Sequence, residues 1–374
     1  MATLGIICEY NPFHKGHEYH ISKAREITGA DTVVALMSGN FVQRGDVAIF
    51  DKKTRCEAAL KCGADLVLEL PTVMSMSTAE RFASSGVAIL EALNSVDYLA
   101  FGGESTDLSS MEKIAKILAF ENEDYKTALS SHLKEGLPFA TAREKALSSV
   151  FSGDAKLISS SNNILAVEYL KAILKLDSKM EPVLIKREGA DYNSSEASSF
   201  MSATGIRKLI SEGSSLSGFV PDTLLPLYEN AKVHSLLNME KSIIANLCKM
   251  APDEIASLPN VSEGLENKIK KAAMESDSFD TLCDNIKSKR YAHSRIRRIL
   301  LYSYLGITKG DMVAPQYIKI LGFNEKGQRL LNKAKQEANL PLVKNFNQIK
   351  GLNNPLAENT WKKELIFDRI YDLF

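Results

Sequence analysis

The stretch GIICEYNPFHKGHEYHI, residues 5–21, decides the fold and marks the end of its first strand as a candidate site. An apolar run, TLGIIC, ends in a polar turn, and a helical period begins where His14 and His17 flank Gly16. Histidine is scarce in the chain, six in all, and three of them lie in this stretch. A buried strand that ends in such a turn brings these side chains to one edge of a sheet.

Four more apolar runs repeat the pattern of the first strand. The five runs are residues 3–8, 32–37, 65–70, 96–101 and 182–187. They are rich in Val, Ile and Leu, as are strands buried on both faces of a parallel sheet, and helical periods separate them. The alternation predicts an α/β fold with a doubly wound parallel five-stranded sheet, in which ligands bind beyond the carboxyl ends of the strands.

The pattern changes at a Ser/Gly/Pro-rich stretch, residues 214–225. Helical periods dominate after it, without clear strand alternation. We therefore expect two domains, the α/β domain at residues 1–213 and a mostly α-helical C-terminal domain at residues 214–374. A chain of 374 residues is long enough for both.

The composition limits the class of protein. Lys and Arg together number 46, as do Asp and Glu, so no global charge draws the chain to nucleic acid or to a membrane surface. The five cysteines contain no CxxC pair, which predicts reduced thiols and no zinc site. Because no run has the length of a membrane span and no signal-peptide pattern is found, we expect a cytoplasmic protein with no membrane partner.

The turn after the first strand can bind an anion. His14 and His17 are three residues apart, so both lie on one side of a first helical turn, and Gly16 lets a ligand approach the backbone. Free N–H groups at a helix N-terminus favour anions, and imidazole donors can stabilise charge that develops on a phosphate. The alternative is a pair of capping or core histidines. The position at a strand-to-helix turn favours nucleotide binding, and a metal site is disfavoured because no carboxylate or Cys lies at matching spacing.

Other strand ends offer further candidates. Residues 38–46, SGNFVQRGD, follow the second strand and form either part of the site or a surface loop. Gly102 and Gly103 end the fourth strand, where they allow close packing on a ribose or adenine or form a plain tight turn. Asn162 and Asn163 open a helix and are either caps or ligand contacts.

The fifth strand and the helix after it bring cations to the same edge. The residues concerned are Lys186 and Arg187 at the strand end and Ser202, Thr204 and Arg207 in SFMSATGIRKLI. Hydroxyls, free amides and a guanidinium at one helix start suit phosphate oxygens. Capping alone explains the two hydroxyls but not the convergence of the set.

One segment of the helical part is strongly basic. KSKRYAHSRIRR, residues 287–298, contains no acidic residue. Such a helix can follow a phosphate backbone, or it can be a solvated helix face. The cations expected to bind RNA are Lys287, Lys289, Arg290, Arg295, Arg297 and Arg298, and an extension of this surface would use Lys319, Lys326, Arg329 and Lys333.

These motifs carry a family resemblance. EYNPFHKGH resembles the HxGH signature of the nucleotidyltransferase superfamily that also contains class I aminoacyl-tRNA synthetases, and SATGIR occupies the place of its second, phosphate-binding motif. Together with SGNFVQRGD, GADLVLELP, FGGES, SNNILAVEY, IKREGADY and ILGFNEKG, they make the chain similar to the bacterial tRNA(Met) cytidine acetate ligases up to about residue 330. The resemblance implies the Rossmann-like fold of the HxGH nucleotidyltransferases.

The resemblance also implies an ATP-dependent ligase. Members of the family activate acetate as acetyl-adenylate, release pyrophosphate, and transfer the acetyl group to the wobble cytidine of elongator tRNA(Met), which forms N4-acetylcytidine. By position, His14, His17 and Arg207 hold the triphosphate and are the expected catalytic residues. The expected ATP contacts are Ile7, Cys8, Glu9, Tyr10, Asn11, Pro12, Phe13, His14, Lys15, Gly16, His17, Glu18, Tyr19, His20, Gly102, Asn162, Arg187, Ser202 and Thr204.

The residue chemistry is compatible with this activity. Positioning and charge neutralisation supply most of the catalysis in phosphoryl chemistry, so no protein nucleophile is needed, and Mg²⁺ is expected to accompany the pyrophosphate. Lys15 departs from the family, in which Asn is frequent at this place. The alternative function is a small-molecule adenylyltransferase of the same superfamily, and a further one is a non-catalytic RNA-binding protein. An aminoacyl-tRNA synthetase is disfavoured because SATGIR replaces its lysine-bearing loop.

Overall fold

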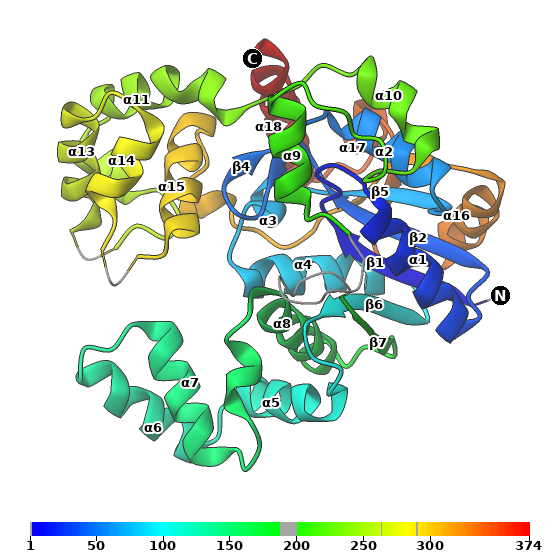
Figure 1. The fold of residues 1–374 in the computed structure, drawn as a ribbon, viewed down its shortest axis with the longest axis horizontal. Coiled ribbons are helices and arrows are strands. Elements are labelled where there is room, and N and C mark those ends of the chain that lie inside the picture. The colour runs from blue at the N-terminus through cyan, green and yellow to red at the C-terminus, as the bar shows by residue number, and fades with distance from the viewer. Residues whose placement is uncertain (1, 188–199, 263, 289–290) are drawn as a thin grey trace.

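A central sheet of seven strands organises the chain, for which a computed structural model describes residues 2–187, 200–262, 264–288 and 291–374. The strand order is β7-β6-β1-β2-β5-β8-β9. Figure 1 labels the first five strands of this order. The strands are β1 (Thr3–Cys8), β2 (Thr32–Ser38), β5 (Leu66–Leu70), β6 (Tyr98–Gly103), β7 (Glu181–Lys186), β8 (Ile318–Phe323) and β9 (Leu342–Val343). A separate two-stranded sheet pairs β3 (Phe41–Val42) with β4 (Asp46–Val47).

All five predicted strands are present and pair in parallel, as expected for an α/β fold. The number of strands is corrected from five to seven, because β8 and β9 come from the segment that was expected to be mostly α-helical. β8 pairs antiparallel with β5, and β9 pairs parallel with β8. Ile318 of β8 is fully buried, so these strands cover an edge of the parallel sheet that would otherwise be open.

The sheet reverses its direction of winding next to β1. From β1 the chain passes to β2 and β5 on one side, and it then returns to form β6 and β7 on the other side. Ligands of open α/β sheets bind at the carboxyl ends of the strands at such a switch point. In this chain that place is the shared edge of β1 and β6.

Helices cover both faces of the sheet (Figure 1). The helices of the α/β part are α1 (Lys15–Thr28), α2 (Lys52–Lys61), α3 (Thr72–Ser75), α4 (Ala79–Ala92), α5 (Leu108–Phe120), α6 (Glu123–Lys134), α7 (Phe139–Val150), α8 (Ser161–Lys175), α9 (Ala203–Ser211) and α10 (Leu225–Glu229). One face packs against α4, α5, α8 and a later helix, α16 (Glu325–Glu337), and the other against α1, α2, α9 and α10.

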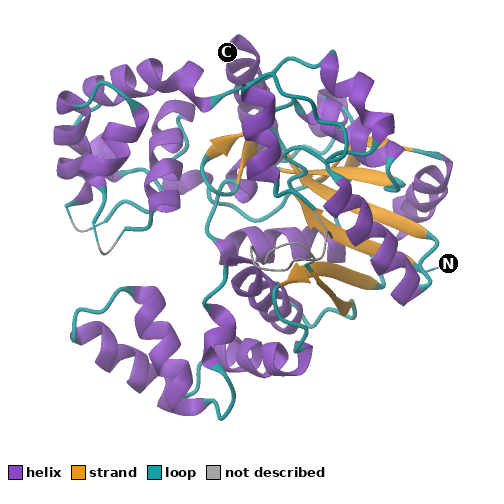
Figure 2. Cartoon of the chain, viewed as in Figure 1, coloured by secondary structure: helices purple, strands orange, loops and turns teal. Residues whose placement is uncertain are grey.

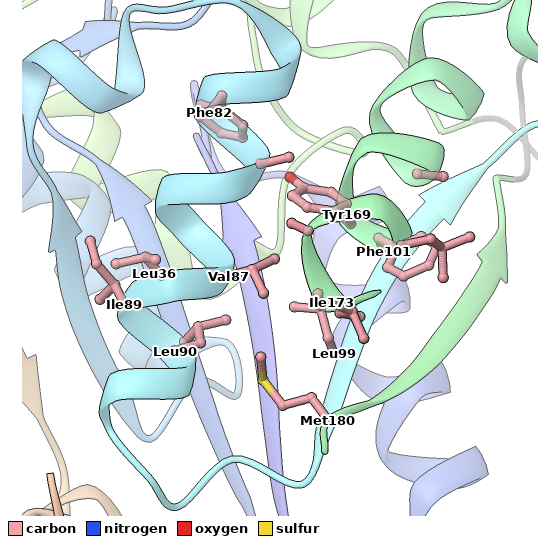
Figure 3. Close-up of a cluster of buried hydrophobic side chains, with 14 of the residues drawn as sticks. Leu36, Phe82, Val87, Ile89, Leu90, Leu99, Phe101, Tyr169, Ile173 and Met180 are labelled. Carbon is pink, nitrogen blue, oxygen red and sulfur yellow. The ribbon is translucent and has the colours of Figure 1, made fainter. Parts of the chain in front are cut away.

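The core of the first face joins side chains from the strands to α4 and α8. Leu36 and Leu99 point from β2 and β6 toward Leu90 of α4 and Ile173 of α8 (Figure 3). Alternate strand residues, such as Val33 and Ala100, fill the second core on the opposite face. Burial on both faces explains why these strands read as continuous apolar runs.

A helical unit projects from the sheet, as Figure 2 shows. Its helices are α11 (Glu240–Lys249), α12 (Pro252–Ala256), α13 (Leu265–Glu275), α14 (Phe279–Ile286) and α15 (His293–Leu305). They enclose their own core, to which the C-terminal helix α18 (Pro355–Leu373) adds Phe367 and Tyr371. A short helix, α17 (Phe346–Lys350), precedes α18. Within the described ranges no helix combines the length and the apolarity that crossing a bilayer requires.

Candidate nucleotide site at the β1 and β6 strand ends

The turn after β1 places His14 as the N-cap of α1. Its Nδ1 accepts a hydrogen bond from the Gly16 backbone N–H at 3.0 Å, and its own N–H donates to Nδ1 of His17 at 3.3 Å. The two imidazole rings stack with centroids 3.8 Å apart. A Cβ at Gly16 would lie 2.9 Å from Cε1 of His14, so the ring can adopt this position only over a glycine. The HxGH spacing therefore builds one rigid imidazole pair.

Both rings are neutral donors in this arrangement. Burial, with Arg187 and Arg207 nearby, lowers the pKa of His14 to about 4. Burial and His14 hold the pKa of His17 well below its usual value. Because Nδ1 of each ring accepts a hydrogen bond, the proton of each neutral ring lies on Nε2. Two Nε2–H groups are thus available as donors to a phosphate at the start of α1.

The aromatic side chains of the turn pack against this pair: Tyr10 and Phe13 both contact the His17 ring. Phe13 is fully buried and Tyr10 is 3% exposed, so these two side chains belong to the core, and their expected role as ATP contacts stays a prediction. Burial raises the pKa of Cys8, whose thiol donates to the Leu36 carbonyl. Burial also lowers the pKa of His20 to about 4.

The remaining residues of the segment differ in exposure. Ile7 packs against the first core, and Asn11 and Pro12 are buried. Asn11 accepts from the Ile49 N–H at 2.8 Å. Glu18 is exposed on α1, and Lys15 donates its backbone N–H to Phe219 at 3.1 Å.

The end of β6 carries a hydrogen-bonded cluster at the same edge. Glu104 accepts from Ser160 Oγ at 2.7 Å and from Asn162 Nδ2 at 2.5 Å. Burial opposes ionisation, but these hydrogen bonds outweigh it, so the pKa of Glu104 is lowered. Asn162 also accepts from Arg187 at 3.4 Å, and a Cβ at Gly102 would lie 3.2 Å from Cγ of Arg187. The structure thus brings Gly102, Asn162 and Arg187 together, as predicted.

The start of α9 faces the turn after β1. Ser202 is the N-cap and accepts from the Gly205 N–H at 3.2 Å. Arg207 donates to the Asn11 carbonyl at 2.8 Å and to Thr204 Oγ1 at 3.1 Å. The second motif therefore contacts the first one directly. The residues between Arg187 and α9 include positions 188–199, which lie outside the described residues.

Positive charge is in excess at this edge. In the described part of the chain, Arg44, Arg55, Arg187 and Arg207 have no carboxylate oxygen within 4.0 Å, the limit for an ion pair. Burial raises the pKa of Glu9, which lies among three of these arginines. Glu9 and Glu104 are the carboxylates described at this edge, so the arginines outnumber them, and an excess of positive charge favours a polyanionic ligand.

Sequence reasoning missed Arg55. Its side chain is fully buried, and it donates to the carbonyls of Phe50 at 2.9 Å, Glu9 at 2.6 Å and Ser38 at 3.1 Å. It therefore ties the turn after β1 to the end of β2. The available signal was weak: an arginine among the small, buried residues of α2.

The basic segment is distributed over two environments. Lys287 is exposed at the end of α14, whereas Lys289 and Arg290 lie outside the described residues. Arg295 donates to the Asn260 carbonyl at 2.7 Å, and Arg297 forms an ion pair with Asp46 at 2.9 Å.

Two of the expected RNA contacts are not accessible. Arg298 is 5% exposed and donates to the Gln43 carbonyl at 3.2 Å. Lys319, expected on the extended surface, is 9% exposed and pairs with Glu69. Both expectations are corrected, because buried side chains engaged with protein groups do not reach a phosphate backbone.

The described residues hold no cluster of three or more His, Cys, Asp or Glu side chains arranged to bind a metal ion.

Comparisons with known proteins agree with this geometry. A sequence model of the HIGH Nucleotidyl Transferase family matches residues 1–374. The tRNA(Met) cytidine acetate ligase of Thermoanaerobacter sp. (strain X514) is 43% identical over 100% of this chain and 95% of its own. That of Caldanaerobacter subterraneus is 45% identical over 94% of this chain and 90% of its own.

Two solved structures also match over nearly the full length of the chain. The structure of Thermotoga maritima TmcAL bound with alpha-thio ATP superposes with a TM-score of 0.90 at 34% identity, covering 98% of this chain and 92% of that one. Its apo form superposes with a TM-score of 0.91 at the same coverage. The imidazole pair, the cation-rich edge and these matches over the full length lead to one assignment: the chain belongs to the HIGH nucleotidyl transferases and, among them, to the tRNA(Met) cytidine acetate ligase family.

Proposed function

We propose that this protein activates acetate with ATP and transfers the acetyl group to the wobble cytidine of elongator tRNA(Met), which forms N4-acetylcytidine. The observation that carries the proposal is the positive edge at the switch point, where the neutral imidazole donors meet Arg187 and Arg207, two arginines that form no ion pair with the described residues. Family membership and the ATP analogue bound to the Thermotoga maritima relative support the same activity.

In the first step an acetate oxygen attacks the α-phosphorus of ATP. A P–O bond forms, the bond to pyrophosphate breaks, and negative charge grows on the leaving group. Arg187 and Arg207 act electrostatically on His14, and they neutralise that charge. The Nε2–H groups of His14 and His17 donate to phosphate oxygens without adding a charged group to the buried turn. Preorganised donors of this kind act by electrostatic stabilisation.

Glycine and amide groups complete the proposed nucleotide site. Gly102 and Asn162 lie beside Arg187 at the end of β6, where they can contact ribose or base, and Ser202 and Thr204 offer hydroxyls at the start of α9. Mg²⁺ would enter with the nucleotide and neutralise phosphate charge.

In the second step the N4 amine of cytidine attacks the acetyl carbon of acetyl-adenylate. The N–C bond forms, the C–O bond to AMP breaks, and the amine loses one proton. The base must leave its stack to reach the anhydride.

We further propose that the chain divides functionally near residue 213, with RNA bound by the helical unit. Exposed Lys287 and partly exposed Arg295 are the described cations of the basic segment that can face a phosphate backbone, and Lys289 and Arg290 are proposed from sequence alone. Residues 318–343 return to the sheet, so the proposed RNA-binding unit consists of the helices between residues 236 and 307.

The test is incubation of the protein with ATP and labelled acetate, with and without elongator tRNA(Met). We expect acetylated cytidine only in the complete mixture, and pyrophosphate release that depends on acetate. ATP consumption that ignores acetate but requires a phosphorylated cofactor precursor would instead identify a small-molecule adenylyltransferase. A protein that binds the RNA without any ATP turnover would refute both enzymatic hypotheses.

A further inference from the structure

The loop of residues 43–46 connects helix α15 to the nucleotide site. On the α15 side, Arg297 Nη2 pairs with Asp46 Oδ2 at 2.9 Å, and its Nε donates to the Gly45 carbonyl at 3.0 Å. Arg298 Nη1 donates to the Gln43 carbonyl at 3.2 Å. Two consecutive arginines of one helix thus hold three of the four loop residues.

The backbone of the loop lies directly on the backbone of the helix. Gly45 has a φ of +75°, which favours glycine, and a Cβ there would lie 2.5 Å from the backbone N of Arg298. Any side chain at this position would push the loop away from the helix. The loop and α15 therefore pack closely, backbone against backbone, at a position that only glycine can occupy.

On its other side the loop holds groups at the strand ends. The Gln43 N–H donates to Glu9 Oε1 at 2.8 Å, and the Gln43 side chain donates to the Ser77 carbonyl at 3.0 Å. Arg44 donates to Ser161 Oγ at 3.1 Å, next to Asn162 of the β6 cluster. The charges of Glu9, Arg44, Asp46 and Arg297 all act on Arg207, which shows how close the loop lies to the second motif.

We propose that Arg297 and Arg298 are positioning residues for acetate activation: they hold the loop of residues 43–46, which fixes Glu9 and Arg44 at the edge of the nucleotide site. The inference rests on the proposed function and assigns to this pair a role other than contact with RNA. Arg298 is 5% exposed, and the Arg297 side chain is 19% exposed with Nε and Nη2 both engaged. Arg298 is therefore buried away from a phosphate backbone, and two of the three guanidinium nitrogens of Arg297 are committed to the loop.

The test compares Arg297→Met with a matched control, Lys271→Met, which removes an exposed cation from α13 of the same helical unit. Acetate-dependent ATP–pyrophosphate exchange is measured at saturating tRNA, and tRNA affinity is measured separately by filter binding. We expect Arg297→Met to lower the kcat of exchange about 10- to 100-fold, the scale of a misplaced active-site group, with the KM for ATP and the Kd for tRNA changed less than about threefold. Lys271→Met should match the wild type in exchange.

Two further variants separate positioning from folding. Asp46→Asn breaks the same ion pair from the loop side and should reproduce the loss of kcat. Arg297→Lys keeps the charge opposite Asp46 but loses the fork that also reaches the Gly45 carbonyl, so it should restore part of the activity. The melting temperature of each variant is recorded alongside.

Three results would overturn the proposal. The first is an unchanged kcat in Arg297→Met and Asp46→Asn, whatever the effect on tRNA affinity. The second is a loss of exchange that only follows a loss of folded protein. The third is a wild-type protein without acetate-dependent exchange, which refutes the proposed function as well and is recognised from the wild-type sample alone.

Discussion

Two groups of charged side chains lie at the same carboxyl edge of the sheet, yet they are built in opposite ways. At the end of β1, Arg55 and Arg207 donate to backbone carbonyls and a hydroxyl. At the end of β5, Glu69 binds Lys52 at 2.7 Å and Lys319 through its other oxygen at 2.5 Å. The arginines at the β1 end form no ion pair with the described residues. The charges around Glu69 at the β5 end neutralise one another.

This difference distinguishes a ligand-binding site from a structural joint, by which we mean the paired cluster of Glu69 with Lys52 and Lys319. The group around Glu69 connects α2, β5 and β8, and Asp368 of α18 joins it through Lys52 at 2.6 Å. The opposite charges of this cluster neutralise one another, so it leaves no unpaired charge for a ligand. At the β1 end, Arg207 donates only to a carbonyl and a hydroxyl, so no ion pair with the described residues cancels its charge, which can act on an anion.

The largest expected effect is on the stability of the paired group. Lys52→Met leaves Asp368 without its cation and Glu69 with one of its two, so we expect the free energy of unfolding to fall by about 3–5 kcal/mol. Urea denaturation measures it. Lys53→Met, at the exposed neighbouring position of α2, is the control and should change stability by less than about 0.5 kcal/mol. Equal effects of the two variants would mean that the pairing does not hold the joint.

At the β1 end we expect the reverse: a substitution should lower activity strongly and change stability little. Arg207→Met should lower acetate-dependent ATP–pyrophosphate exchange about 10²- to 10³-fold, since one donor to the developing charge is lost. Unfolding free energy should change by no more than about 1 kcal/mol, because Arg207 forms no ion pair with the described residues. Lys208→Met, whose side chain is 76% exposed, is the matched control. A stability loss as large as that of Lys52→Met would erase the distinction between the two groups.

The sequence predicted the first group better than the second for a physical reason. The HxGH turn, the end of β6 and the start of α9 are each local patterns that follow or open an element, so their convergence follows from the topology. Lys52 and Asp368 are 316 residues apart, and no local pattern announces such a pair. β8 was missed because its run follows a long helical stretch and pairs antiparallel at the sheet edge. Arg298 was predicted to contact RNA because only its charge was considered. The helical period of α15 directs its side chain inward, beside buried Ile299.

A smaller expected effect is a change in the stability of the folded protein with pH, which comes from Glu364 beside the Glu69 cluster. Burial and the nearby Glu69 raise the pKa of Glu364 to about 7, and its carboxyl accepts from the Thr72 N–H at 2.6 Å and hydroxyl at 2.8 Å. Between the ordinary carboxyl pKa and about 7 the folded protein binds more protons than the unfolded chain, so stability should fall as pH rises through this window. From pH 5.5 to 7.5 the loss should be on the order of 1–2 kcal/mol.

Glu364→Gln tests this slope. The amide keeps an acceptor and gains a donor for Thr72, so the fold should persist while the titration disappears. Denaturation midpoints of both proteins are compared across that range of pH. A slope that survives in Glu364→Gln would assign the titration to another group of the joint.

The smallest expected effect has the opposite sign and belongs to the imidazole pair. The pKa of His14 is lowered to about 4 by burial, so between that value and the ordinary histidine pKa the unfolded chain binds more protons than the folded protein. Stability is therefore lost as pH falls, by about 1 kcal/mol from pH 6.5 to 5.5 for this residue. His14→Asn keeps the side-chain acceptor for the Gly16 N–H and removes the titration, so its unfolding free energy should fall less over this range, and His293→Asn at an exposed position is the control. Equal slopes in His14→Asn and the wild type would mean that the His14 ring is charged in the folded protein. The β1 end would then carry one more unpaired positive charge than a neutral imidazole pair gives it.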